Sequence, residues 1–320
     1  MINDDRHPLY RVRRPIYWTG PAEDLGEAIN VGIEFNRHGI IVRGDGRIGK
    51  TEGLGLLSRE TKWRNYGMFW QRVLSPLPGQ STEGYFFNEI RLAACLKIRE
   101  RSQSIFGVHH ATDFFCESAA MIDAEVIVVS FDDANRLQRE DYDHLATLDS
   151  HIAERGFRLF VVLMMQADAD GNSAEETAEQ PWPSQITGRF TADRYLYTGL
   201  RGRKEFKEAL RTFANQRWPA ETGPTFLERF AGAACALGWH VEQQSDMFYD
   251  AVEEARSKAD LVPDAPFPMQ CFDTATYYLT VRVAGENANF ARFTPEDFKK
   301  AVELSGLVAL ELSRRPKDKK

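Results

Sequence analysis

The chain has 320 residues, 43% hydrophobic and 27% charged, which is typical of a globular protein with one large or two modest domains. Its formal net charge of −7 excludes a surface coated in positive charge for nucleic acid but is compatible with a local basic strip. No apolar run approaches the roughly 18 residues that cross a bilayer, the first residues lack a signal peptide's apolar stretch, and the four cysteines form no C-x-x-C pair. We therefore expect a cytoplasmic protein with no membrane contact, zinc site or disulfide framework.

A phosphate-binding motif follows the first predicted helix and strand. Residues 1–22 show no regular pattern, residues 23–36 predict an amphipathic helix, and the short apolar run 38–43 predicts a buried strand. Residues 44–51 then read G-D-G-R-I-G-K-T, which fits the P-loop pattern G-x-x-x-x-G-K-[ST] at every fixed position. Residues 52–60 carry leucines that predict a helix. A strand, a glycine-rich loop and a helix form the context in which this motif binds nucleotide.

The residue types of the loop predict their roles. Its glycines let backbone N–H groups approach the phosphates, and a helix that begins near Lys50 adds a favourable dipole. We expect Lys50 to reach the β- and γ-phosphates of ATP and the Thr51 hydroxyl to hold Mg²⁺. The alternative is a glycine loop that binds nothing. The expected nucleotide-binding residues are Gly44, Asp45, Gly46, Arg47, Ile48, Gly49, Lys50, Thr51 and Glu52.

Strands and helices alternate along the next part of the chain. Strands are predicted over residues 67–74, 126–131, 157–164 and 194–197, and helices over residues 83–101, 110–122 and 138–155. The acidic segment 167–180 predicts a surface loop. From residue 202 on the pattern is helical, with breaks at residues 219–224 and 261–268. This order predicts an α/β fold: a parallel sheet flanked by helices, followed by a helical C-terminal region.

Two acidic residues follow the strand predicted over residues 126–131. In P-loop enzymes a carboxylate at the end of a neighbouring strand holds Mg²⁺. We therefore expect Asp132 to serve the metal, as in a Walker B motif, and Asp133 to activate the attacking water. The structural alternative is a helix N-cap pair that opens the following turn.

Two single polar residues complete the predicted site. Gln166 follows the strand over residues 157–164, where a polar side chain would lie between the phosphate loop and the acids and could sense the γ-phosphate. Arg189 precedes the last predicted strand, at what would be a subunit edge, where its rigid charged fork could reach a neighbour's γ-phosphate. A surface salt bridge is the alternative role for Arg189.

Basic residues gather at three places despite the negative net charge. One cluster is near the start, at Arg11, Arg13 and Arg14, and another is the tail 314–320. The alternative for each cluster is a solvated face or a disordered end, and for any single cluster this alternative is favoured over a nucleic-acid contact. The third cluster, at the end of a predicted helix, supplies the candidate DNA-binding residues: Lys97, Arg99 and Arg101.

The order of these parts resembles an AAA+ ATPase, which has a P-loop, Walker B acids, a polar sensor, an Arg-Phe pair before the last strand and a helical lid. More narrowly, the chain looks like the TniB/TnsC-type ATPases that regulate DNA transposition. The similar phrases are I-V-R-G-D-G-R-I-G-K-T, F-D-D-A-N-R-L, R-G-F-R-L-F-V-V-L-M-M-Q, and I-T-G-R-F followed by Y-T-G-L-R-G-R-K-E-F. The likeness covers roughly residues 24–215 and, more loosely, the helical stretch to residue 270.

The resemblance implies a division of labour among the site residues. Residues 49–51 would bind phosphate, Asp132 would hold Mg²⁺, Gln166 would sense the γ-phosphate, and Arg189 would act in trans on a neighbour's nucleotide. The sequence departs from the family pattern at Asp133, where a glutamate is usual. Because aspartate is one methylene shorter, its carboxylate would be displaced from the attacking water, and misplacements of about 1 Å can slow a reaction about a hundredfold. The departure implies slow hydrolysis.

The resemblance also implies partners and a domain organisation. An ATP-dependent homo-oligomer, a ring or a filament, would assemble without base preference on double-stranded DNA and contact a transposase and a targeting adaptor. The expected parts are an irregular arm (residues 1–22), an AAA+ core (23–200), a helical lid region (201–312) and a basic disordered tail (313–320). A P-loop ATPase or kinase-like signalling or defence module that does not bind DNA is the alternative.

Overall fold

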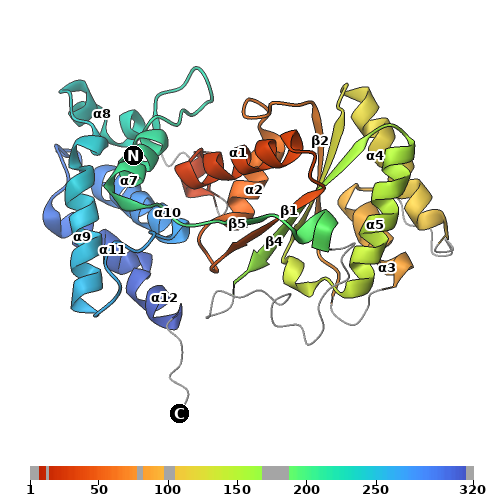
Figure 1. Ribbon diagram of the computed structural model, residues 1–320. Coiled ribbons are helices and arrows are strands. Elements are labelled where there is room, and N and C mark those ends of the chain that lie inside the picture. The colour runs from red at the N-terminus through yellow and green to blue at the C-terminus, as the bar shows by residue number, and fades with distance from the viewer. Residues whose placement is uncertain (1–6, 12–13, 78–81, 97–104, 168–186, 315–320) are drawn as a thin grey trace, which may run out of the picture. The chain divides into compact units, whose positions relative to one another are not determined.

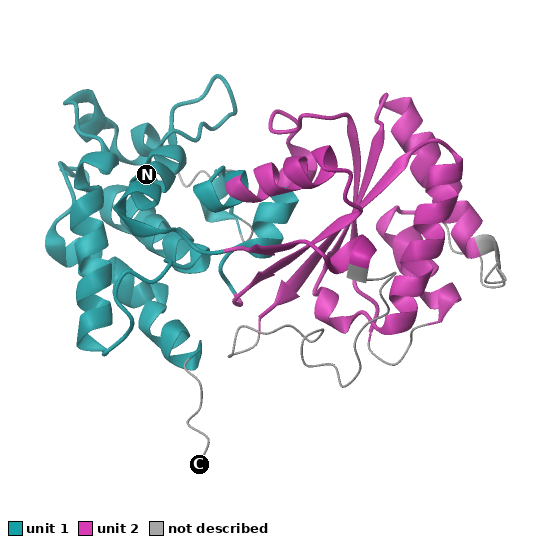
Figure 2. Cartoon of the chain, viewed as in Figure 1, with its two compact units in different colours: residues 1–23, 47–56, 198–320 teal, residues 24–46, 57–197 magenta. Residues whose placement is uncertain are grey.

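The computed structural model describes residues 7–11, 14–77, 82–96, 105–167 and 187–314. The chain divides into two compact units, each assembled from separated segments (Figure 2). Residues 24–46 and 57–197 form one, which we call the sheet unit. Residues 1–23, 47–56 and 198–320 form the other, which we call the helical unit.

The sheet unit is built on a parallel sheet, as the alternating pattern predicted (Figure 1). Its strands in the described part of the chain are β1 (Gly39–Gly44), β2 (Met68–Leu74), β3 (Val126–Asp132), β4 (Arg158–Gln166) and β5 (Arg194–Leu196). Their order across the sheet is β2-β3-β4-β1-β5. The central strands β3 and β4 are almost entirely buried, as expected for parallel strands that helices cover on both faces.

Helices pack on both faces of this sheet. The helices that belong wholly or partly to the sheet unit are α1 (Gly20–Glu34), α2 (Lys50–Arg59), α3 (Glu83–Ala93), α4 (Ile105–Met121) and α5 (Arg139–Glu154). Side chains of α3, α4 and α5 form one apolar cluster with alternate strand residues such as Leu159 and Val161. On the opposite face, α1 approaches Phe160 so closely that a Cβ at Gly32 would lie 2.9 Å from its ring.

The helix predicted over residues 83–101 is shorter in the structure, which corrects the prediction. The helix α3 ends at Ala93, because the chain turns in a left-handed conformation at Cys95 (φ 55°). The N–H of Leu96 donates to the carbonyl of Arg91 (2.9 Å), and the N–H of Cys95 donates to that of Leu92 (3.0 Å). This bonding is a Schellman motif, which glycine usually forms. The cysteine at that position hid the helix end from the sequence pattern.

Other predicted boundaries differ by a few residues. The helix α4 begins at Ile105 instead of residue 110, and β4 extends to Gln166, two residues beyond the predicted end. The helix α5 starts with a capping box between Gln138 and Asp141 and ends before Gly156, whose φ is 81°. That stop at glycine confirms the prediction.

The helical unit packs around aromatic side chains. Its C-terminal helices in the described residues are α7 (Gly202–Ala214), α8 (Phe226–Ala236), α9 (Ser245–Lys258), α10 (Met269–Tyr277), α11 (Pro295–Ser305) and α12 (Leu307–Arg314), and it also includes parts of α1 and α2. The ring of Phe206 meets those of Phe248 and Phe272 edge-on, at centroid distances of 4.9 and 5.4 Å. Leu9 and Tyr17 join the same core, so the irregular N-terminal segment packs as part of this unit. The breaks predicted near residues 219–224 and 261–268 fall between helices.

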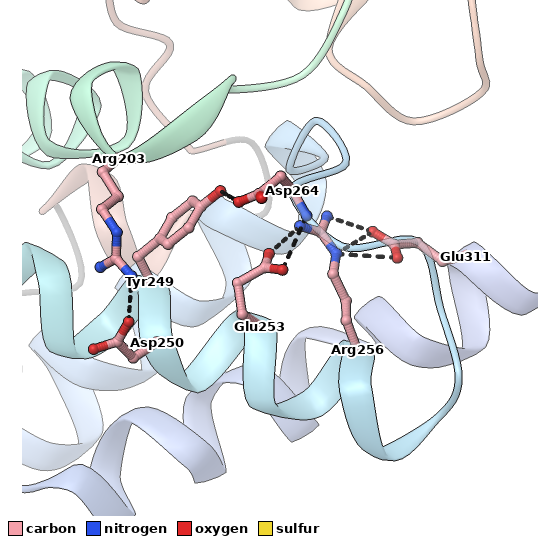
Figure 3. Close-up of polar contacts among 7 residues, drawn as sticks. All are labelled: Arg203, Tyr249, Asp250, Glu253, Arg256, Asp264 and Glu311. Carbon is pink, nitrogen blue, oxygen red and sulfur yellow. Dashed lines mark hydrogen bonds and ion pairs between the residues drawn. The ribbon is translucent and has the colours of Figure 1, made fainter.

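A buried arginine fixes the last helix to this unit (Figure 3). The Arg256 side chain on α9 is only 1% exposed and donates to Glu311 of α12 at 2.6 Å and to Glu253 at 2.6 Å. Burial alone would lower the pKa of Arg256, but the hydrogen bonds and charges of Glu311 and Glu253 more than offset this and raise it. The guanidinium therefore stays charged and holds α12 against α9.

Candidate nucleotide-binding site

The phosphate loop has the local geometry that the motif predicts. Strand β1 ends at Gly44 and α2 begins at Lys50, so residues 45–49 form the loop. Two residues of this loop are left-handed, Arg47 (φ 65°) and Gly49 (φ 103°). Alternation of left-handed with right-handed residues turns successive N–H groups toward one point and creates a nest for an anion. A left-handed arginine is uncommon, and its presence indicates that the loop geometry is imposed by its surroundings.

Within the helical unit, the loop is tied to the start of α10. The N–H of Gln270, in the first turn of α10, donates to the carbonyl of Arg47 at 3.4 Å. The N–H groups of a helix's first turn have no acceptor inside their own helix, so this contact satisfies a donor that would otherwise lack an intrahelical partner. The first turn of α10 thus contacts the left-handed arginine of the loop.

A charge cluster lies one turn further along α10. Arg14 donates to the Asp273 carboxylate (2.7 Å) and carbonyl (3.1 Å), and its guanidinium lies 4.1 Å from the Tyr277 ring centre. Burial raises the pKa of Asp273, Arg14 opposes this rise, and the negative charge of Glu52 in the first turn of α2 adds to it. The sequence marked Arg14 only as part of a basic cluster, whereas the structure shows it neutralising an acid.

Asp132 lies at the carboxyl end of β3, where the sequence placed it. The Ser75 hydroxyl donates to the Asp132 carbonyl (2.6 Å), and the N–H of Asp133 donates to Oδ1 of the Asp132 carboxylate (3.1 Å). Arg72, on the neighbouring strand β2, approaches Oδ2 at 4.0 Å. Arg72 and Ser75 had no signal in the sequence, because only the pairing of β2 with β3 brings them to Asp132.

The predicted magnesium ligands fit the chemistry of that ion. Thr51 lies in the first turn of α2 and offers a hydroxyl, and Asp132 offers a carboxylate at the end of a strand. Within the described residues no three His, Cys, Asp or Glu side chains gather into a metal cage. Magnesium does not need a cage of this kind, because it usually binds through one or two carboxylates together with nucleotide phosphates and water.

Asp133 has a left-handed backbone (φ 54°) and begins the short helical turn η2 (Ala134–Arg136). Its carboxylate lies 3.1 Å from the guanidinium of Arg136, three residues later, and both side chains are about half exposed. Within the described part of the chain, Asp133 makes no side-chain capping bond to this turn. By position Asp133 is the N-cap residue of this turn, as the structural alternative predicted, but its side chain pairs with Arg136 and does not cap the turn.

Gln166 lies between the phosphate loop and the acids. Strand β4 separates β3 from β1, and Gln166 is in register with Gly44, the last residue of β1. A Cβ built on Gly46 would be 3.5 Å from the Gln166 side-chain nitrogen. The side chain of Asn135, in the turn after the acids, bonds the Gln166 backbone twice, at 2.6 and 2.9 Å. Sequence reasoning missed Asn135, although it lies only two residues after Asp133.

Arg189 lies at the opposite end of the sheet. It belongs to the helical turn η3 (Thr187–Thr191), whose Phe190 packs beside Gly39 at the start of β1. The six residues of β1 span about 20 Å, so Arg189 lies about one strand length from Gly44. Its guanidinium is 3.5 Å from Asp149, which is 7% exposed and also lies 3.1 Å from His38. The Arg189 side chain remains 42% exposed, so it is open to a second partner.

The predicted DNA-binding residues Lys97, Arg99 and Arg101 lie outside the described residues. Among the basic residues near the start, Arg14 is paired with Asp273 and Arg11 lies 5.1 Å from the Trp218 ring centre. In the described ranges, no helix is both long and apolar enough to cross a bilayer.

No family model matches the chain, and no curated protein matches it in sequence. Among solved structures it is similar to the ORC2 protein of Aeropyrum pernix in its ADP form, with a TM-score of 0.54 and 13% identity over 95% of this chain and 73% of that one. Looser matches, both with a TM-score of 0.42, are the Aeropyrum pernix ORC1 protein in complex with DNA (12% identity, 94% and 86% covered) and Drosophila ORC bound to DNA (14%, 87% and 61%). The sheet, the P-loop after β1, the C-terminal helices and the likeness to the ORC2 protein show that this chain has an AAA+ fold of the ORC/Cdc6 type.

Proposed function

We propose that the protein is an ATP-binding and slowly ATP-hydrolysing AAA+ switch that assembles on double-stranded DNA and regulates transposition. The observation that carries the nucleotide part is the phosphate loop, left-handed at Arg47 and Gly49 between β1 and α2, with Gln166 beside it. The transposition part rests on the sequence resemblance to TniB/TnsC-type ATPases.

Each residue of the site has a separate task in this proposal. Lys50 binds the β- and γ-phosphates, and Thr51 and Asp132 hold Mg²⁺, which supplies charge neutralisation on those phosphates. Asp133 orients and deprotonates the attacking water. Gln166 contacts the γ-phosphate and so distinguishes ATP from ADP.

The position of Arg189, at the end of the sheet where strand β1 begins, supports the assembly in this proposal. About one strand length from Gly44 in its own sheet unit, and still 42% exposed, it is suited to a neighbouring subunit's nucleotide. ATP-dependent homo-oligomers on DNA would then present a platform for a transposase and a targeting adaptor. Lys97, Arg99 and Arg101 stay the candidate DNA contacts.

Nucleotide binding is tested by calorimetry with ATP and Mg²⁺. We expect Lys50→Ala to abolish measurable binding, because it removes the mobile cation of the phosphate loop. Lys62→Ala, a change at an exposed lysine of the sheet unit, is the matched control and should bind as the native protein does. Equal ATP affinity in Lys50→Ala would remove the P-loop assignment.

DNA-dependent assembly is tested by size-exclusion chromatography with duplex DNA and a non-hydrolysable ATP analogue. We expect oligomers that need both ligands and that weaken steeply between about 50 and 200 mM salt, because neutralised phosphates release counterions. The net charge of −7 and the internal pairing of Arg14 favour the second candidate, an ATPase that does not bind DNA. That candidate predicts ATP binding with no change of elution on DNA.

A further inference from the structure

The strand β4 extends beyond its neighbour on one side only. Its pairing with β3 ends where Phe131 meets Leu163, whereas its pairing with β1 continues through Met164 and Met165 to Gln166 opposite Gly44. At Gln166, the last rung of the sheet therefore has a strand on the β1 side and a turn, η2, on the β3 side.

The side chain of Asn135 takes the place of the missing strand residue. The Gln166 N–H donates to Asn135 Oδ1 (2.6 Å), and Asn135 Nδ2 donates to the Gln166 carbonyl (2.9 Å). A primary amide carries a donor and an acceptor and can satisfy both groups of one residue, as a neighbouring strand does. Aspartate in this position would lose the donor, and alanine would lose both groups.

This rung connects three parts of the site inside the sheet unit. On one side Gln166 is in register with Gly44, where the phosphate loop begins, and the Ala167 N–H donates to the Gly44 carbonyl (3.2 Å). On the other side Asn135 belongs to the turn that Asp133 begins. A displacement of the turn therefore moves the backbone of Gln166, and the reverse also holds.

We propose that Asn135 is a positioning residue that couples the γ-phosphate sensor Gln166 to the turn of the catalytic acid. The inference rests on the proposed ATPase function. Asn135 does not touch the nucleotide in this mechanism. It holds the Gln166 backbone, so the Gln166 side-chain amide stays in a fixed position beside Gly46. A movement of Gln166 is thereby transmitted through Asn135 to the turn that contains Asp133.

The test measures the ratio of ATP affinity to ADP affinity by calorimetry on the full-length protein, in a double-mutant cycle. Gln166→Ala should lower this ratio about tenfold or more, since a hydrogen bond to a charged group is lost. Asn135→Ala and Asn135→Asp should lower it comparably, with ADP affinity kept. The double variant Asn135→Ala/Gln166→Ala should be no worse than the poorer single variant, because coupled residues are not additive. Asn289→Ala, at an exposed asparagine of the helical unit, should leave the ratio unchanged.

Each outcome supports or overturns the proposal. A loss of stability alone would lower the amount of active protein but would not change the ratio of ATP affinity to ADP affinity. A normal ratio in Asn135→Ala therefore overturns the proposal that Asn135 positions Gln166. Multiplicative effects in the double variant also overturn it, because they show that Asn135 and Gln166 act independently. If Gln166→Ala keeps a normal ratio while the native protein binds ATP, the coupling fails and nucleotide binding stands. If the native protein binds neither nucleotide, the proposed function fails, and the inference fails with it.

Discussion

Asp133 is one methylene shorter than the glutamate that TniB/TnsC-type ATPases usually have at this position. The effect of the missing methylene on hydrolysis can be tested by replacing Asp133 with glutamate. Asp133→Glu should raise kcat severalfold with ATP affinity unchanged, because the longer side chain brings the carboxylate closer to the attacking water. Steady-state phosphate release at saturating ATP is the measurement.

Asp133→Asn is the companion variant. It should bind ATP normally and hydrolyse it at least tenfold more slowly, because an amide cannot accept the proton of the water. Native rates in Asp133→Asn would place the catalytic acid elsewhere in the chain.

The Arg14–Asp273 ion pair predicts a pH-dependent contribution to stability. Arg14→Ala should lower the free energy of unfolding by about 1 kcal/mol near pH 7, a value discounted because both side chains are partly exposed. The pair exists only when Asp273 is ionised, and burial raises the pKa of Asp273. The difference between the native protein and Arg14→Ala should therefore grow as pH rises from about 4, the ordinary aspartate pKa, through the raised folded value.

Urea unfolding of both proteins at several pH values between 4 and 7 measures this difference. Arg14→Lys, which keeps the charge but loses the flat guanidinium against Tyr277, should fall between them. A difference that shrinks with rising pH would contradict the ion-pair account.

Sequence reasoning located the residues of the site that belong to local patterns and missed those that depend on neighbouring strands. The P-loop and the Asp132-Asp133 pair follow directly from spacing and strand ends. Arg72 approaches Asp132 only because β2 pairs with β3, and the spacing of residues along the chain does not encode that pairing. Asn135 could have been suspected, since it stands in the phrase F-D-D-A-N-R-L, but its partner is the Gln166 backbone thirty-one residues away.

At the scale of elements, a buried ion pair between Arg256 of α9 and Glu311 helps to hold α12 in place (Figure 3). Glu311→Ala should lower the free energy of unfolding by about 3 kcal/mol, because it removes one of the two carboxylates that pair with this buried cation among the described residues. Thermal or urea unfolding of the full-length protein measures this change.

Glu303→Ala is the matched control for that experiment. Glu303 pairs with Lys300 at 2.9 Å on the surface of α11, where both side chains are exposed, so its loss should change stability far less than Glu311→Ala does. Equal effects of the two substitutions would show that burial does not set the value of the Arg256 pair.

The ends of helices were predicted well where a typical capping residue such as glycine follows the helix, and poorly where another residue type takes that position. The end of α5 at Gly156 was predicted, because glycine adopts the left-handed conformation without strain. The end of α3 was missed, because Cys95 adopts the same conformation without being typical of it. The periodicity of the sequence indicates whether a segment is a helix or a strand. Capping residues indicate where it ends, but tertiary contacts can end a helix where no typical capping residue is present.

At the scale of the whole molecule, the role of Arg189 can be separated from its contact with Asp149. If Arg189 acts across a subunit boundary, Arg189→Ala should keep ATP binding but lose hydrolysis and ATP-dependent oligomers. Stabilisation of transition-state charge by an arginine of this kind can be worth about 10³–10⁵ in rate in other phosphoryl-transfer proteins.

Mixing Arg189→Ala with Lys50→Ala protein is the sharper measurement. Mixed assemblies should regain part of the ATPase activity at interfaces that pair an intact phosphate loop with an intact Arg189. Mixed oligomers that stay inactive would show that Arg189 serves its own subunit, as a salt-bridge partner of Asp149.

The parallel sheet could be predicted from the alternation of strands and helices, but the strand order and the grouping of segments could not. Both depend on contacts between residues far apart in the chain. The sheet unit runs from residue 24 to residue 197, yet residues 47–56 inside these limits group with the C-terminal helices. The contact of Arg47 with Gln270 is part of that grouping, and the local spacing of residues along the chain does not predict this contact.

The grouping of residues 47–56 with the C-terminal helices determines how a genetic screen on this protein should be read. Hits that abolish nucleotide binding should fall in the codons of the phosphate loop and again near codon 270, more than two hundred positions downstream. A hit in the second region would fall in the helix whose first-turn N–H donates to the Arg47 carbonyl. For the same reason, a gene fragment that stops at codon 200 would encode the complete P-loop motif without the helix that holds it, and its product should not bind ATP.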